Sequence, residues 1–295
     1  MPGKVISHST ILLCSVFFVI SCGSSDNNTS DTKVIYGSDD RRDLFDSYIS
    51  STMKSLASST VALVKTKAIS ESSSLTYRIS GVTFGTKAKL CAGERFREQP
   101  AAAHCSGFLV GPDLVVTAGH CIRDEKACEA TSFVFGYAMT SRDSNPSIVK
   151  RSNVYGCRSI VKTSATPDLD FAVIRLSRKV TDQQPLKFRR SGKPYAGTRL
   201  TLIGNPSGLP TKVAKNATIR SNSHQNYLVA TTDSFGGNSG SAVFNSQTGV
   251  VEGILVRGER DFVSNGTCNK VKRCSISECR GEDVTRAPSF AQYIR

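Results

Sequence analysis

The chain has 295 residues, of which 39% are hydrophobic, and its formal net charge is +14 at pH 7. A chain of this length and apolar content can bury a substantial core, and no internal repeat stands out, which excludes a repeat architecture. The positive charge indicates either a generally solvated basic surface or a surface that attracts an anionic envelope or an acidic substrate. Charge alone also fits nucleic acid, but no nucleic-acid motif is recognisable, so nucleic acid is not expected as a partner.

The N-terminal residues are expected to lie outside the folded domain. Lys4 gives a basic start and residues 11–20 an apolar core too short for a transmembrane helix, so residues 1–21 are predicted to be a secretory signal peptide. The run Val19-Ile20-Ser21-Cys22 resembles a bacterial lipobox, which predicts a lipid on Cys22 and a flexible tether over residues 22–33. The alternative is an ordinary signal peptide with cleavage nearby.

From residue 34 onward the pattern is typical of an all-β protein. Short β-branched and aromatic runs alternate with Gly, Pro, Asn and Asp, and long helical periodicity is scarce. Such spacing indicates a sandwich or barrel. Strands are predicted over residues 60–64, 108–110, 114–117, 133–137, 171–176, 200–203 and 250–256, and a short helix near residues 288–294.

Three motifs carry the residue types of a nucleophilic acyl-transfer site. His120 stands in Thr117-Ala118-Gly119-His120-Cys121, Asp170 precedes an apolar run, and Ser239 stands in Gly236-Gly237-Asn238-Ser239-Gly240-Ser241. A serine hydroxyl needs a neighbouring base to attack at neutral pH, and a carboxylate holds the imidazole in one tautomer. We therefore predict that Ser239 is the nucleophile, His120 the general base and acid, and Asp170 the orienting carboxylate.

Each motif has an ordinary explanation when it is taken alone, as a turn, a packed histidine or a strand cap. The order His, Asp, Ser favours a triad of the chymotrypsin type, since other triad enzymes use other orders. Asp168 is the alternative to Asp170. Asp170 is preferred because residues 171–174 predict a buried strand that would shield it from water. The backbone N–H groups of Gly237 and Ser239 are expected to form the oxyanion hole.

With these motifs the chain resembles a trypsin/chymotrypsin-type serine peptidase, of the bacterial branch that includes the glutamyl endopeptidases. The segments Val34-Ile35-Tyr36-Gly37 and Ile203-Gly204-Asn205-Pro206-Ser207-Gly208 also resemble that branch, and the similarity covers roughly residues 34–260. The resemblance implies two six-stranded antiparallel β-barrels within a peptidase domain of residues 34–295. The first barrel is expected over about 55–180 and the second over about 185–262, followed by a disulfide-rich tail over 263–295. The triad would lie in the cleft between the barrels.

The resemblance also suggests a specificity. Asp233 lies six residues before Ser239, where trypsin-like enzymes place the carboxylate that binds a Lys or Arg side chain, so cleavage after basic residues is expected. Val256 and Gly258 match the edge strand that binds substrate. The glutamyl branch has a pocket histidine where this chain has Leu255, which argues against a preference for glutamate. Phe235 replaces a cysteine that braces the pocket in trypsin, so the shape of the pocket is not expected to follow that of trypsin in every detail.

The cysteines indicate export. Without Cys14 and Cys22 eight remain, and an even number in an exported chain predicts four disulfides. The resemblance implies the pair Cys105–Cys121, which would clamp the loop of His120. Five of the eight precede Ser239, so full pairing requires a bridge from the tail to the preceding region. A zinc cluster of the three tail cysteines is the alternative, but the tail lacks histidine; no metal and no cofactor are expected.

Two questions stay open at this level. Asn238 replaces the charged residue that pairs with a new N-terminus in animal enzymes, so no salt bridge of that kind is expected to order the turn. The chain is either active as a tethered protein or trimmed near Val34. The predicted protein is an endopeptidase acting on proteins or peptides, either a lipoprotein of the bacterial envelope or secreted. A non-catalytic binding protein of the same fold is the alternative, but such homologues usually lose a triad residue.

Overall fold

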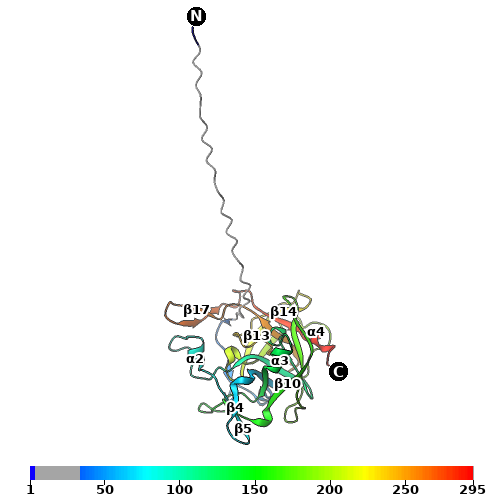
Figure 1. Ribbon diagram of the computed structural model, residues 1–295. Helices are drawn as coiled ribbons and strands as arrows, with labels where there is room; N and C mark the ends of the chain where they lie inside the picture. Colours follow the sequence, from blue (N-terminus) through cyan, green and yellow to red (C-terminus); the bar gives the residue numbers. More distant parts are fainter. Residues whose placement is uncertain (4–33, 295) are drawn as a thin grey trace. The chain divides into compact units, whose positions relative to one another are not determined.

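The computed structural model describes residues 1–3 and 34–294 of the chain (Figure 1). The predicted signal peptide beyond residue 3, the whole tether and the proposed lipidation site Cys22 lie outside the described residues. Within the described residues, no helix has the length and apolar character needed to cross a membrane.

The first barrel closes from six antiparallel strands in the order β10-β11-β7-β6-β3-β8. Their bounds are β3 (Thr60–Lys65), β6 (Ala103–Gly111), β7 (Leu114–Thr117), β8 (Thr131–Phe135), β10 (Val154–Ala165) and β11 (Asp170–Leu176). Most strands are buried along nearly their full length, because both the barrel interior and the neighbouring elements cover them. This explains why they are continuous apolar runs in the sequence. The expectation of an all-β fold with two six-stranded barrels is confirmed.

The second barrel is formed by six strands of a seven-stranded sheet, closed by the pairing of β12 with β13. Its strands are β12 (Arg199–Gly204), β13 (Lys212–Ser221), β14 (Tyr227–Ala230), β15 (Ala242–Asn245), β16 (Val251–Arg257) and β20 (Glu282–Arg286), and β2 (Arg42–Asp43) is added along β13. The barrel therefore extends beyond residue 262, where its end was expected. The sequence of β20 is Glu-Asp-Val-Thr-Arg, which has a single large apolar residue and gives no strand signal of its own.

Shorter elements lie around the barrels. One small sheet consists of β4 (Ile69–Glu71), β5 (Thr76–Ile79) and β9 (Ile148–Lys150). A hairpin of β17 (Phe262–Ser264) and β18 (Asn269–Val271) extends from the barrels near α2 (Phe84–Lys87), as Figure 1 shows. The remaining helices are α1 (Ser51–Ser58), α3 (Glu125–Glu129) and α4 (Pro288–Ala291), with 3-10 turns η1 (Thr66–Ala68), η2 (Gly119–Cys121), η3 (Arg151–Asn153) and η4 (Pro206–Gly208).

The short C-terminal helix α4 follows β20 and packs on the first barrel. Phe290 of α4 lies 6.2 Å from Phe108 and 6.5 Å from Phe171, measured between ring centroids. Aromatic pairs at these separations stabilise a contact beyond the area they bury. The end of the chain thus joins the two barrels, and the predicted helix is present but shorter than expected.

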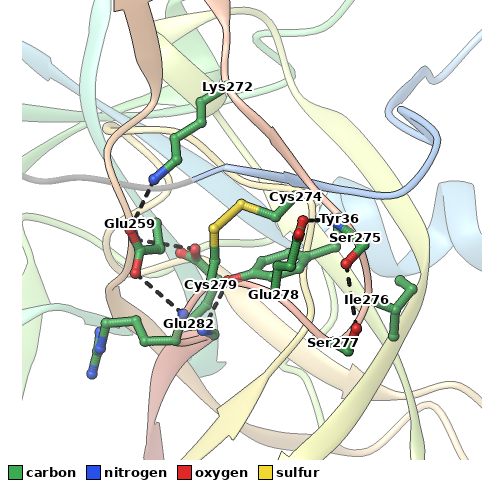
Figure 2. The surroundings of a disulfide bond; sticks show 12 residues. Tyr36, Glu259, Lys272, Cys274, Ser275, Ile276, Ser277, Glu278, Cys279 and Glu282 are labelled. Atoms are coloured by element: carbon green, nitrogen blue, oxygen red, sulfur yellow. Dashed lines mark hydrogen bonds and ion pairs between the residues drawn. A yellow bond between two sulfur atoms is a disulfide. The ribbon is translucent and has the colours of Figure 1, made fainter.

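The N-terminal segment is buried against the C-terminal part of the domain. β1 (Ile35–Tyr36) pairs in parallel with β19 (Arg273–Cys274), and Val34, Ile35 and Tyr36 are all buried. The Tyr36 hydroxyl accepts the backbone N–H of Gly281 at 2.8 Å. Figure 2 shows Tyr36 beside the Cys274–Cys279 disulfide, so the segment that begins at Val34 is held by a cross-linked loop.

All eight described cysteines are in disulfides, as expected for an exported chain. Cys105–Cys121 is present, as the resemblance implied, and Cys91–Cys268 is the bridge from the tail to the preceding region. The other two pairs are Cys128–Cys157 and Cys274–Cys279. The three tail cysteines are therefore not available as zinc ligands.

Candidate active site

The first barrel positions His120 against Asp170. His120 lies in η2, directly after β7, and Asp170 begins the neighbouring strand β11. The His120 Nδ1 atom lies 2.7 Å from Asp170 Oδ2, and the His120 backbone N–H donates to Oδ1 at 3.1 Å. Two bonds to one buried carboxylate fix both the ring and its backbone. This leaves Nε2 as the ring nitrogen that could accept a proton.

The alternative carboxylate, Asp168, lies elsewhere. Its side chain is 75% exposed, and its Oδ1 is 3.8 Å from Nε2 of His224 rather than near His120. Asp170, in contrast, is buried. Asp170, rather than Asp168, is therefore the carboxylate that contacts His120.

The turn that carries Ser239 packs on the strand ends that lead to His120. The Ser239 carbonyl accepts the backbone N–H of Ser106 at 2.8 Å. The following residue, Gly240, has a φ of +89°, and a Cβ atom there would collide with the side chain of Thr117 and crowd the backbone of Ala118. Only glycine permits this approach. Serine and histidine, from opposite barrels, are thus brought to one place.

The Cys105–Cys121 disulfide strengthens this arrangement. Cys105 precedes Ser106, which contacts Ser239, and Cys121 follows His120. The sulfur atoms lie close enough to the His120 ring to suggest a metal site. Sulfur atoms joined in a disulfide are not thiolate ligands, however, so these donors do not fit a metal.

The two peptide groups before Asn238 are fixed by hydrogen bonds of their carbonyl oxygens. The Gly236 carbonyl accepts the Ser207 N–H at 2.5 Å, and the Gly237 carbonyl accepts the Ser106 hydroxyl at 2.8 Å. In a trans peptide the N–H points opposite to the carbonyl, so the Gly237 N–H is directed away from Ser207. Gly237 has a φ of +92°, which disfavours any other residue.

Asn238 is a buried part of the same turn. Its N–H donates to the Phe235 carbonyl at 3.0 Å, and its Oδ1 accepts the Ser241 hydroxyl at 3.1 Å. The side chain therefore braces the turn with neutral hydrogen bonds. This is consistent with the expectation that no salt bridge to a new N-terminus orders the turn.

Asp233 is placed differently from what its spacing suggests. Its Oδ1 accepts the Tyr36 N–H at 2.7 Å and its Oδ2 accepts the Asp40 N–H at 2.9 Å. Burial, followed by the nearby Asp40 carboxylate, raises the pKa of Asp233 to about 8. Both oxygens are thus used to hold the N-terminal segment. The expectation that Asp233 binds a basic substrate side chain loses its support, because its bonds are directed to the protein's own backbone.

The strand β16 runs beside the turn that carries Ser239. The Gly240 N–H donates to the Leu255 carbonyl at 2.8 Å, and the Leu255 N–H donates to the Ser241 carbonyl at 3.1 Å. Leu255 and Val256 are both buried, Leu255 in the core of the second barrel. Gly258 follows the strand, where a Cβ atom would collide with the Glu282 carboxylate.

Glu282 is a buried acid beside Ser234 and Gly258 that the sequence analysis did not single out. It is fully buried, and its Oε2 accepts the Ser234 hydroxyl at 2.9 Å. The pairing of β20 with β14, where Glu282 lies opposite Ala230, and with β16 brings it to this position. A single acid in a short polar strand gives no local signal of burial.

A cavity of about 510 Å³ adjoins the oxyanion turn. It is lined by Lys87, His104, Gly236, Gly237 and Phe262, among others. Burial, followed by the charges of Lys65 and Lys87, lowers the pKa of His104 to about 3, so its imidazole is neutral. The cavity therefore borders the two glycines that precede Asn238 and Ser239.

Comparison with known proteins agrees with this architecture. A family model described as trypsin-like peptidase domain matches residues 105–254. The curated protein trypsin Blo t 3 of Blomia tropicalis is 29% identical over 128 residues, which cover 40% of this chain and 46% of that protein. The chain thus spans less than half the length of this curated relative.

A solved structure of a Glu endopeptidase in complex with MPD shares the fold, with a TM-score of 0.52 and 18% identity. It is matched over 88% of this chain and 97% of its own. The family model covers about half of the chain. The chain therefore belongs to the trypsin-like peptidase family.

Proposed function

We propose that the protein is an exported serine endopeptidase that cleaves peptide bonds through an acyl-enzyme. The observation that carries this proposal is the 2.7 Å contact of His120 Nδ1 with Asp170 Oδ2, next to the turn of Ser239. The Ser239 hydroxyl attacks the peptide carbonyl while His120 takes its proton. Asp170 stabilises the imidazolium, and the N–H groups of Gly237 and Ser239 bind the oxyanion.

The same residues complete the reaction. The tetrahedral intermediate collapses, the carbon–nitrogen bond breaks, and His120 gives its proton to the leaving amine. Water then attacks the ester on Ser239, with His120 again as base, and the acid product leaves. No other group is needed to balance these steps.

A non-catalytic protein of the same fold is the second candidate. The intact set of His120, Asp170 and Ser239, with the oriented peptide of Gly237, favours catalysis over binding alone. A glutamyl preference has less support, since Leu255 lies in the barrel core where that branch has a histidine. Cleavage after basic residues remains the preferred specificity, but it requires a carboxylate other than Asp233.

Labelling with a fluorophosphonate probe tests the catalytic proposal. Wild-type protein should react covalently and should hydrolyse a mixed peptide library, whereas Ser239→Ala should do neither. Ser223→Ala, which removes an exposed serine of the same barrel, is the matched control and should behave as wild type. Equal turnover by wild type and Ser239→Ala would exclude Ser239 as the nucleophile.

The location is proposed on separate grounds. Four disulfides suit an oxidising compartment. The lipobox-like run before Cys22 supports attachment to the envelope through lipid on that residue. Mass spectrometry of the purified protein should find diacylglycerol on Cys22. An unmodified start elsewhere would refute the anchor and leave the peptidase proposal intact.

A further inference from the structure

The amine of Lys87 joins the two barrels through backbone carbonyls. Lys87 ends α2, and its Nζ donates to the Ala101 carbonyl at 3.3 Å and to the Ala103 carbonyl at 3.4 Å, where β6 of the first barrel begins. It also donates to the Ser207 carbonyl at 3.0 Å, in the turn η4 that follows β12 of the second barrel. An ammonium group has three donors, so these three carbonyls use all of them. Lys87 therefore fixes η4 relative to the first barrel.

Ser207 has a backbone conformation that needs support from its surroundings. Its φ is +53°, in the left-handed region that residues with a side chain rarely adopt. Such a conformation persists where the surrounding structure determines it. Both polar groups of the Ser207 backbone are engaged, since the N–H donates to the Gly236 carbonyl at 2.5 Å and the carbonyl accepts from Lys87. Loss of the Lys87 bond would remove one of these two restraints.

The Gly236 carbonyl belongs to the peptide group that carries the Gly237 N–H. This peptide lies between two glycines, so it can turn over at less cost than a peptide between residues with side chains. Because the carbonyl and the N–H of a trans peptide point in opposite directions, the Ser207 bond that holds the carbonyl also directs the N–H. The preceding N–H, that of Gly236, is held separately by Asp261 Oδ2 at 2.9 Å. Ser207 thus sets the direction of the Gly237 N–H.

A second lysine of the neighbouring cavity provides a contrast. Lys89 lines the same cavity as Lys87 and Gly237. It is exposed, and in the part of the chain that the structure describes its amine makes no hydrogen bond to Ser207. Lys87 is therefore distinguished by its bond to Ser207 and not by its charge alone. The two lysines, two positions apart in the chain, form a matched pair for a test.

We propose that Lys87 is a positioning residue for the oxyanion hole. Lys87 holds the Ser207 carbonyl, and the Ser207 N–H holds the Gly236 carbonyl. The Gly237 N–H is thereby presented to the oxyanion that forms from the peptide carbonyl. This inference rests on the proposed function, since it concerns how the same site stabilises the oxyanion. Lys87 acts through Ser207 rather than by touching the substrate, so its contribution arises where negative charge develops in the transition state.

The kinetic test separates kcat from KM. Lys87→Met keeps an unbranched apolar stem but has no donor, so it should lower kcat by at least about tenfold with KM within about twofold of wild type. The upper bound is the loss of a whole oxyanion donor, about 10²–10³-fold in kcat. Lys89→Met is the control and should keep kcat within about twofold. Each kcat is expressed per molecule that fluorophosphonate labels at completion, so unfolded protein does not enter the value. Lys87→Gln, which is polar but has a shorter reach, is the second variant and should also lower kcat.

An exchange measurement separates this inference from the catalytic proposal. In Ser239→Ala protein, adding Lys87→Met should speed amide exchange at Ser207 by at least about tenfold, while the hydrogen-bonded Gly240 amide should be unchanged. If wild type is not labelled by fluorophosphonate but Ser207 exchange depends on Lys87, the catalytic proposal fails alone and the contact through Ser207 stands.

Four results would overturn the positioning role of Lys87. The first is a wild-type kcat in both Lys87 variants, and the second is a rise in KM at constant kcat. The third is an equal loss of kcat in Lys89→Met, which would assign the effect to the charge of the cavity. The fourth is amide exchange at Ser207 that does not respond to Lys87→Met.

Discussion

Asp233 accepts the backbone N–H of Tyr36 at 2.7 Å, although the two residues are 197 positions apart in the chain. Its other oxygen accepts the N–H of Asp40. Asp233, six residues before Ser239, thus fastens the N-terminal segment to the second barrel. One carboxylate therefore couples the conformation of the N-terminal segment to that of the turn before Ser239.

Replacing Asp233 should loosen the N-terminal segment. Asp233→Ala leaves the N–H groups of Tyr36 and Asp40 without their acceptor, and an unsatisfied buried donor costs about 1–3 kcal/mol. We expect a loss of about 2–5 kcal/mol in the free energy of unfolding, with faster amide exchange at both residues. The control is Asp113→Ala, which removes a partly exposed ion pair with Arg175 and should cost about 0–1 kcal/mol. Unchanged exchange at Tyr36 in the Asp233 variant would contradict the fastening role.

The same carboxyl group should make stability depend on pH. Burial and the Asp40 carboxylate raise the pKa of Asp233 to about 8 in the folded protein, whereas an unfolded aspartate has a pKa of about 3.9. The folded state binds this proton more tightly, so the contribution is present below about pH 4 and is lost as pH rises to about 8. Denaturant unfolding should show a smaller decline from about pH 5 to 8.5 in Asp233→Asn than in wild type. An equal decline in both proteins would assign the pH dependence to other groups.

The contact between His120 and Asp170 predicts a large catalytic effect. Asp170→Asn should lower kcat by about 10³–10⁴-fold, since an amide favours the wrong imidazole tautomer. The wild-type kcat/KM should rise through about pH 6–7.5 as the imidazole loses its proton. Asp168→Asn, at the other acid of the same segment, is the control and should keep kcat within about twofold, because its exposed side chain does not touch His120. Activity that stays constant down to about pH 4 would count against histidine as the base.

The parts of the site that could be predicted from sequence are those whose chemistry restricts the neighbouring residues. His120 and Ser239 each lie in a turn that allows only small residues beside them, as the close approach of Gly240 to Thr117 shows. Such constraints leave a pattern within five or six residues. Five of the six strands of the first barrel were also predictable, since burial on both faces makes them continuous apolar runs, whereas the partly exposed β10 was not predicted.

The remainder depends on contacts between distant segments. Asp233 has the spacing of a pocket carboxylate, but its partners come from the N-terminal segment, which no local pattern reveals. Glu282 is buried by the pairing of β20 with β14 and β16, and its own strand is polar. The partner of Cys91 likewise followed from no motif, because Cys268 is 177 residues away.

The separation of the cysteines predicts how much each disulfide contributes to stability. In the chain-entropy model, the cross-link restricts the unfolded chain more when the closed loop is longer. Cys91–Cys268 spans 177 residues and Cys274–Cys279 spans 5. Replacing both cysteines of the long pair by serine should lower the free energy of unfolding by up to about 5 kcal/mol, against about 2 kcal/mol for the short pair. Chemical denaturation of the two double variants, with the other cross-links verified by mass spectrometry, measures the difference.

Local effects give a further distinction, since loss of Cys274–Cys279 should speed amide exchange in β1, which pairs with the strand ending at Cys274. A larger loss for the short pair than for the long pair would show that holding the N-terminal segment matters more than restricting the unfolded chain.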